Sequence, residues 1–506
     1  MKKLIYILLL QTLFFGVSSC SDELDITPSY ELNEVNGITN EGKAEDAVHG
    51  IYPYIVQGNN YSGGLVYALA SRSGLARFST SDYNMTTTQT NNSPSQQYFW
   101  LGYYETINAA NYAINGINKL GSDVISDDRK SELLAEARFL KAFACTYVFW
   151  KYGHWWESND ESPYGILYRD DLATVDNLQV GRLSVGDSYE RIMADIDFAI
   201  ENLPDFKERG NRYVSKEFAK IFKAKILLYR YGFNDGRNKP ELEEALAIVD
   251  EILNSNIPGF SMQSDLAQVY EDSWDSEENL FSGYLEQNGN ADIWNASSYY
   301  FSTLITRGTL VWDWTTESQI TAGLVNDADD WFKADGRWPI ATGLMPWPYN
   351  ATSTFKYYAW KKVCRLGQYW GLNAEPQDNK YNTYFFRYSE LYIMKSELLA
   401  RTGASVAEAI EPINTMRSLR TNPVLETLNP TSEQELMDLI FKEYSLETFL
   451  ENGSAFFASL RMKNADGVLW MEGLKGFSIE FNKICYPIPD VEMLVNREII
   501  QNPDLE

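Results

Sequence analysis

Residues 128–152 read DRKSELLAEARFLKAFACTYVFWKY, and this stretch decides the fold class. Its apolar positions recur every three or four residues, at Leu133, Ala137, Leu140, Ala144 and Tyr147. Because an α-helix makes one turn in 3.6 residues, these side chains share one helix face. The spacing therefore predicts a long helix with that face buried.

The same spacing recurs in both halves of the chain. It predicts further helices over 103–120, 187–203, 215–232, 242–253, 388–403, 406–419 and 431–452. Pro204 and Gly232 fit the ends of two of them, because proline cannot continue a helix and glycine favours its C-terminal cap. We expect Ser215 to be the N-terminal cap of the helix over 215–232. Short turns join neighbouring helices, which is typical of tetratricopeptide-like pairs that stack to bury their faces. We therefore expect a mostly α protein built on such pairs.

The N-terminus has the features of a secretion signal. Two lysines precede an apolar run over residues 4–15, which is too short to span a bilayer as a helix. The run is followed by VSSC at residues 17–20, which resembles the lipobox of bacterial lipoproteins. We expect residues 1–19 to be a signal peptide and residues 20–40 a tether whose first residue, Cys20, is lipidated. The alternative is an ordinary secretory signal followed by a chance cysteine.

An anchor of this kind is stable only with two or more acyl chains, as a processed lipoprotein carries. The acidic run after Cys20, SDELD at residues 21–25, resembles the signal that sends such lipoproteins to the outer face of the outer membrane. We therefore expect a lipid-anchored protein of the outer membrane that faces the cell exterior.

The composition limits the classes of partner. Beyond the signal no apolar run reaches the roughly 20 residues that a membrane helix needs. The formal net charge is -27 and becomes -29 when Lys2 and Lys3 leave with the signal, so nucleic acid is excluded as a partner. No Pro-, Gly- or Ser-rich linker divides the rest, so we expect residues 41–506 to form a single body.

The residues for common catalytic and metal sites are missing from the sequence. With Cys20 acylated, Cys145, Cys364 and Cys485 form neither a disulfide framework nor a CxxC pair, and we expect Cys145 to be a buried structural thiol. The chain has only two histidines, and it contains neither HExxH nor GxSxG. We expect no enzyme, no cofactor and no metal, although a glycosidase-like pair of carboxylates depends on spatial separation alone.

The periodic pattern fades between residues 260 and 382. This segment divides the body into a helical part at 41–259, a loop-rich variable part at 260–382 and a helical part at 383–506. Nine of the fourteen tryptophans lie between Trp274 and Trp370. Flat aromatic rings stack on the apolar faces of sugar rings, so we expect at least two to be exposed in one cleft. The candidates for contact with a ligand are Trp294, Tyr299, Trp312, Trp314 and Trp347. The alternative is that the rings fill the core of an irregular domain.

A second set of candidates lies between Tyr61 and Trp100. Helical periodicity is weak here, and Ser, Thr, Asn and Gln are frequent. We expect a surface loop that offers Arg77, Asp82 and Tyr83 to the ligand.

Five stretches in the same order resemble the SusD/RagB family of outer-membrane nutrient-binding lipoproteins. They are the lipobox with its acidic run; 136–143 continuing to Trp150-Lys151-Tyr152-Gly153; Asp195-Ile196 with Leu203-Pro204 and 212–215; 386–397 with 413–417; and Tyr486-Pro487-Ile488-Pro489 with Gln501-Asn502-Pro503. The usual Glu-Arg before the late helix is Lys442-Glu443 here, and the following Glu-Gly-x-Arg is replaced by 451–454. These departures affect subfamily and ligand and leave the fold assignment unchanged.

The resemblance implies a mostly helical, SusD-like scaffold of tetratricopeptide-like pairs with a loop-rich ligand-binding insertion. It also implies a partner, a SusC-like TonB-dependent outer-membrane transporter, to which a captured oligosaccharide is passed without chemistry. The alternatives are capture of peptides, as RagB-like relatives perform, and a surface glycosidase.

Overall fold

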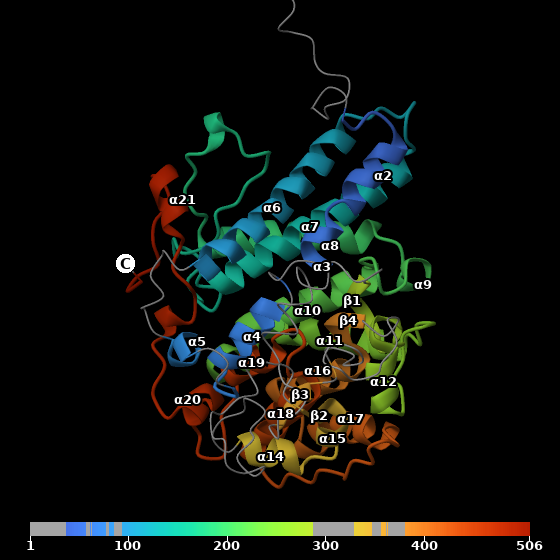
Figure 1. Cartoon of the computed structure of the whole chain (residues 1–506), viewed down its shortest axis with the longest axis vertical. Helices are drawn as coiled ribbons and strands as arrows, with labels where there is room; N and C mark the ends of the chain where they lie inside the picture. Colours follow the sequence, from blue (N-terminus) through green and yellow to red (C-terminus); the bar gives the residue numbers. More distant parts are fainter. Residues whose placement is uncertain are drawn as a thin grey trace, which may run out of the picture.

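The computed structural model of the protein describes residues 37–56, 61, 63–76, 80–85, 94–286, 328–346, 356–360, 362 and 380–505. Helices dominate these residues, as the sequence predicts (Figure 1). No helix among them combines the length and the apolar composition that a membrane span requires.

Four helices form a layer at the N-terminal side of the body (Figure 1). They are α2 (Glu41–His49), α6 (Pro94–Asn118), α7 (Asp127–Tyr152) and α8 (Val185–Asn202). The helix predicted over 128–152 is confirmed as α7, which begins after Ser126, whose side chain accepts a hydrogen bond from Arg129 N. The expectation of a single buried face was too narrow. Helices on several sides of α7 bury almost every residue after Leu133, including Glu136, Lys141 and Lys151.

The next layer continues the pairing of neighbouring helices. It contains α10 (Lys216–Gly232), α11 (Pro240–Asn254), α16 (Tyr388–Arg401), α17 (Val406–Leu419) and α18 (Glu433–Thr448). α10 packs on α11, α11 on α16, and α16 on both α17 and α18. The predicted cap at Ser215 is confirmed, since its hydroxyl accepts from Phe218 N at 3.3 Å. The helices predicted in this half are therefore confirmed within a few residues at each end.

An aromatic core joins the two layers. Phe143 of α7 is 1 % exposed, and its ring centroid lies 4.9 Å from Phe222 of α10 and 5.7 Å from Phe385. The rings of Tyr61 and Tyr147 also pack against the Phe143 ring. We call these five residues the aromatic core.

Shorter elements complete the described residues. The α-helices are α3 (Tyr52–Val56), α4 (Gly63–Arg72), α5 (Thr80–Asn84), α9 (Phe206–Arg209), α12 (Leu266–Asp272), α14 (Ala328–Ala334), α15 (Trp338–Ala341), α19 (Ser454–Ser459), α20 (Trp470–Lys475) and α21 (Asp490–Val495); the 3-10 helices are η1 (Val175–Asn177), η2 (Phe233–Asp235), η3 (Ser273–Asp275) and η6 (Phe481–Lys483). The expectation of a loop between residues 61 and 100 was wrong where the structure describes this segment, because α4, α5 and the start of α6 lie there.

Two small antiparallel sheets lie within the predicted variable part. β1 (Asn279–Glu286) pairs with β4 (Lys380–Arg387), so that Glu286 faces Lys380. β2 (Thr342–Pro346) pairs with β3 (Lys356–Trp360), so that Pro346 faces Lys356. The sequence pattern showed no regular structure here, because short strands leave little periodicity. The strands hold points that are far apart in the sequence next to one another.

The first described residues, Gly37 and Ile38, lie beside α6. Ile38 crosses α6 at Gly116, where an added Cβ would lie 2.8 Å from the Ile38 Cβ. A glycine at this position therefore allows the close crossing. Asn40 follows and caps α2, accepting from Lys43 N at 3.0 Å.

Candidate functional site

Ten charged side chains meet where the variable part joins the helical body. Five are basic and five acidic, and all except Asp335 are buried. We call them the ionic cluster, which consists of Glu278, Asp335, Arg337, Lys362, Arg387, Arg417, Arg420, Glu443, Glu447 and Glu451.

Arg387, at the end of β4, is central to the ionic cluster. Its Nη1 donates to Glu278 Oε2 at 2.7 Å and to Glu447 Oε1 at 3.1 Å. Its Nη2 donates to Glu451 Oε1 at 2.7 Å and to the Glu447 backbone oxygen at 2.7 Å. Arg420 reaches the same two carboxylates, Glu278 and Glu447. One guanidinium therefore ties β1 and β4 to the C-terminal half of α18.

The carboxylates on α18 and just after it contact residues of the variable part. Glu443 and Glu447 lie four residues apart on one face of the helix, and Glu451 follows its end. Arg337, just before α15, donates to Glu443 Oε1 at 3.0 Å and Glu447 Oε2 at 3.2 Å. Lys362, just after β3, pairs with Glu451 at 2.8 Å. The chain is thus fixed to α18 and the residues just after it at two points, by Arg337 before β2 and by Lys362 after β3.

Opposite charges in the ionic cluster favour the charged forms of Glu447 and Arg387. Burial raises the pKa of Glu447, but the neighbouring Arg420, Arg387 and Arg337 outweigh burial and hold this pKa well below its ordinary value of 4.5. The pKa of Arg387 is raised because Glu451, Glu447 and Glu278 outweigh the opposing effect of burial. A charge-balanced set of this kind fixes geometry without creating a reactive group.

Sequence reasoning missed the ionic cluster. Charged residues are rarely buried, so Arg387 and Glu447 were not candidates for the interior. The one available signal is the regular spacing of Glu443, Glu447 and Glu451 along a predicted helix.

Most of the predicted ligand contacts lie outside the described residues. This applies to Trp294, Tyr299, Trp312, Trp314, Trp347 and Arg77, which stay predictions. Four other tryptophans of the same region are described, and they pack into the body: Trp274, Trp331, Trp338 and Trp360. Trp360, for example, lies 5.5 Å from Trp338 and 4.8 Å from Phe449 between ring centroids. For these four rings the alternative of core packing holds.

Asp82 and Tyr83 were expected on a surface loop, and this expectation was wrong. Both lie on α5 and are buried. Asp82 accepts a hydrogen bond from the Tyr486 hydroxyl at 2.5 Å and lies 3.9 Å from Arg72 Nη1. The Tyr83 hydroxyl donates to the Leu474 backbone oxygen at 3.4 Å. Contacts with the C-terminal segment thus hold both side chains inside the fold.

The described cysteines and histidines have structural surroundings. Cys145 is buried as predicted, and burial raises its pKa and that of Cys485 to about 12, so neither is a ready thiolate. Burial lowers the pKa of His154, whose Nδ1 lies 2.7 Å from Glu157 Oε1. The His49 ring packs at a tilt against Tyr213, with 5.0 Å between ring centroids.

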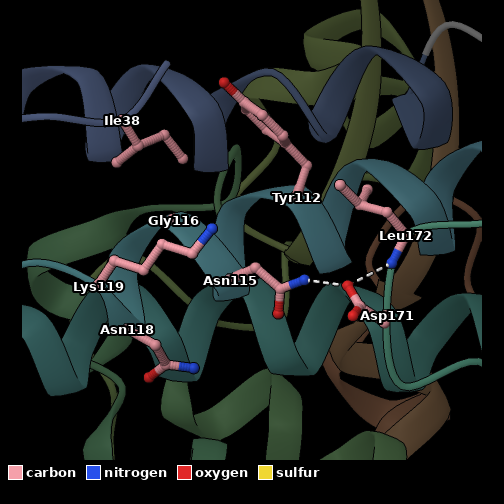
Figure 2. A pocket seen from close by; sticks show the side chains of 8 residues that line it. All are labelled: Ile38, Tyr112, Asn115, Gly116, Asn118, Lys119, Asp171 and Leu172. Carbon is pink, nitrogen blue, oxygen red and sulfur yellow. Dashed lines mark hydrogen bonds between the residues drawn. The ribbon is translucent and has the colours of Figure 1, made fainter. Parts of the chain in front are cut away.

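A hollow of about 400 Å³ opens on the surface at the C-terminal end of α6 (Figure 2). Its walls are Ile38, Tyr112, Asn115, Gly116, Asn118, Lys119, Asp171 and Leu172. The side chain of Asn115 donates to Asp171 Oδ1, which also accepts from Leu172 N at 2.7 Å. We call this feature the α6 hollow. Sequence reasoning missed it, because its residues come from three separate segments.

Asparagines on one face of α6 hold in place the wall of the α6 hollow that includes Asp171 and Leu172. Asn111 donates to the backbone oxygens of Arg169 and Asp171, both at 3.0 Å. Asn108 accepts from Ala173 N at 3.1 Å. With Asn115 these residues follow helical spacing, so one stripe of amides fixes the segment at 169–173 against the helix.

Two family models match the chain. A model described as "Starch-binding associating with outer membrane" matches residues 23–228, and the model of the SusD family matches residues 259–504. A SusD-like protein of Bacteroides ovatus is 27 % identical over 218 residues, which are 42 % of this chain and 37 % of that protein. A SusD-like protein of Formosa agariphila is 21 % identical over 80 % of this chain and 79 % of its own length.

Solved structures share the fold. A SusD superfamily protein from Bacteroides thetaiotaomicron superposes with a TM-score of 0.67 at 18 % identity, covering 92 % of this chain and 100 % of that one. A protein whose structure is described as a laminarin-binding SusD-like protein gives a TM-score of 0.67 at 19 % identity with the same coverage. The mostly helical fold implied by the sequence is therefore confirmed.

Proposed function

Because this chain belongs to the SusD/RagB family, we propose that it is a cell-surface lipoprotein that captures an oligosaccharide and passes it to a SusC-like TonB-dependent transporter. The observation that carries the proposal is the gathering of tryptophans in the variable part. Nine of fourteen lie there, and five of these, Trp294, Trp312, Trp314, Trp347 and Trp370, lie outside the described residues.

The frame of the variable part supports this role. β1 and β4 pair at one point where the chain leaves and re-enters the described body, and β2 and β3 pair at another. The ionic cluster fixes both sheets to α18. Binding costs less entropy when the supports of the contacting residues are already ordered. The body thus provides a rigid base for whatever the intervening segments bind.

The charge of the protein supports a neutral ligand. At a net charge of -27 the surface repels polyanions, whereas uncharged sugars do not experience this field. One structural neighbour is described as binding laminarin, which supports a glycan over a peptide. No described feature favours peptide capture or glycoside hydrolysis.

Attachment to the outer membrane is part of the proposal. Cys20 carries the lipid, and one of the matching family models is described as associating with the outer membrane. From Cys20 to Gly37 the chain can reach at most about 60 Å, at about 3.5 Å per residue. A body tethered to the membrane over this distance can stay beside a transporter in the same membrane.

Binding measurements on residues 21–506 test the proposal. We expect calorimetry and affinity electrophoresis to show binding of at least one neutral glycan without turnover. Trp312→Ala, Trp314→Ala or Trp347→Ala should weaken binding tenfold or more if the ring stacks on the ligand. Tyr54→Ala is the matched control, since Tyr54 is an exposed aromatic on α3, outside the variable part.

Other outcomes of the same experiment would replace the proposal. Binding of peptides alone would favour the RagB-like alternative, and release of shortened glycan would show a hydrolase. Labelling with radioactive palmitate, lost on Cys20→Ala, tests the anchor separately. Co-purification of the full-length protein with an outer-membrane β-barrel from detergent extracts tests the partner.

A further inference from the structure

The α6 hollow lies at the other end of the molecule from α14 and α15, two described helices of the variable part (Figure 1). α2 and the C-terminal end of α6 are at one end of the long axis, and α14 and α15 are at the other (Figure 1). The hollow is therefore separate from these described elements of the variable part. At about 400 Å³ it falls within the size range of small-ligand sites and has room for about one or two sugar rings.

Several polar groups in the α6 hollow have no hydrogen-bond partner among the described residues. They are the Tyr112 hydroxyl, the Asn118 amide, the Lys119 ammonium and the second carboxylate oxygen of Asp171. In Figure 2 the Lys119 side chain runs back along α6 toward Asn115, and Asn115 turns toward Asp171. The carbonyl oxygen of Asn115 also has no partner. Both donors and acceptors are thus available within one small space.

This combination matches a saccharide better than other small ligands. Each sugar hydroxyl both donates and accepts, so it needs donors and acceptors side by side, as amide, carboxylate and ammonium groups provide. The charges of Lys119 and Asp171 balance, which favours a ligand without net charge. Tyr112 adds an aromatic ring that is only half buried.

Contacts within the protein hold the walls of the α6 hollow in place. The amide stripe of α6 fixes the wall at Asp171, and the close crossing of Ile38 over Gly116 fixes the opposite wall. Little conformational entropy is then lost on binding. We propose that the α6 hollow is a second saccharide-binding site, specific for a short neutral sugar and separate from the insertion.

This inference rests on the proposed function in that both concern glycans, but the two can fail independently. Saturation-transfer NMR with neutral mono- and disaccharides is the test. We expect a signal from wild-type residues 21–506 and from the triple variant Trp312→Ala/Trp314→Ala/Trp347→Ala. Adding Tyr112→Leu and Lys119→Met to the triple variant should remove the remaining signal, and each change alone should weaken binding at least threefold.

The control is Glu105→Gln, an exposed change on the same helix and away from the hollow, which should leave the signal unchanged. Circular dichroism checks that each variant folds. Loss of all short-sugar binding in the triple variant would overturn the second site and leave capture by the insertion intact. A signal that survives after Tyr112→Leu and Lys119→Met are added to the triple variant would also overturn it. Retention of a long glycan by the wild type, measured separately, reports on the proposed function alone.

Discussion

The aromatic core and the ionic cluster hold two parts of one body together by different means. Around Phe143, rings from α7, α10 and β4 meet at centroid distances of 4.8 to 5.7 Å in several orientations. Around Arg387 the guanidinium donates directed hydrogen bonds to the carboxylates of Glu278, Glu447 and Glu451 and to the Glu447 backbone oxygen. Apolar contact is non-directional, whereas a buried ion pair tolerates only the partner that balances it. The fold uses the directed contacts where the variable part must be held in one position.

The largest effect should come from removing the central cation of the ionic cluster. Arg387→Met leaves Glu278, Glu447 and Glu451 with too little positive charge in a buried site. Such a loss costs about 3–5 kcal/mol of unfolding free energy, which denaturant titration can measure. Lys220→Met is the control, because the pair of Lys220 with Glu251 is at the surface and is worth less than about 1 kcal/mol. Equal effects of the two changes would contradict a special role of burial.

Phe143→Ala should cost nearly as much, about 3–4 kcal/mol, because it leaves a cavity among packed rings. The expected contrast with Arg387→Met lies in the pH dependence. The loss from Phe143→Ala should be the same at pH 7 and pH 4, since the rings of the aromatic core belong to Phe and Tyr, and burial raises the pKa of Tyr61 and Tyr147 further above this range. A loss that shrinks in acid would mean that the aromatic core depends on charge.

Acid should weaken the ionic cluster before the aromatic core. The folded pKa of Glu447 is well below 4.5, so its contribution is fully present above about pH 4.5 and is lost as the pH falls through the folded value. Glu397 behaves alike: burial raises its pKa, but Arg461 and Arg401 outweigh burial and lower it.

Unfolding free energy measured between pH 7 and pH 3 should therefore decline below about pH 4.5. Glu447→Gln should be less stable at pH 7 but should decline less steeply, since one titrating group is gone. A variant that follows the wild-type slope would show that other carboxylates dominate.

The smallest effect concerns the entry of the chain. Gly116→Ala places a Cβ 2.8 Å from the Ile38 Cβ, so Ile38 must move. Crowding of this kind costs about 1–2 kcal/mol. Gly467→Ala is a poor control because Gly467 has a positive φ, but Gly42→Ala is a fair one, since an added Cβ meets only the Asn40 side chain at 3.6 Å. Pairing Gly116→Ala with Ile38→Ala should recover part of the loss.

The helices could be predicted from the sequence because local periodicity determines them. The boundaries of α17 match the prediction over 406–419, and Ser215 caps α10 as expected. The burial of Asp82 could not be predicted, because its partners Arg72 and Tyr486 are close to it only after folding. The ionic cluster and the α6 hollow could not be predicted from the sequence for the same reason. Each assembles residues from segments that no local pattern connects.

The paired strand ends also set how freely the variable part can change. Pro346 faces Lys356, so the chain is held at both ends of residues 347–355 whatever their sequence. Doubling the length of a segment whose ends are held costs only about 0.6 kcal/mol more in closure entropy. Insertions and replacements between Pro346 and Lys356 should therefore cost little stability. Exchanging this segment is a way to alter ligand preference while the rest of the body stays the same.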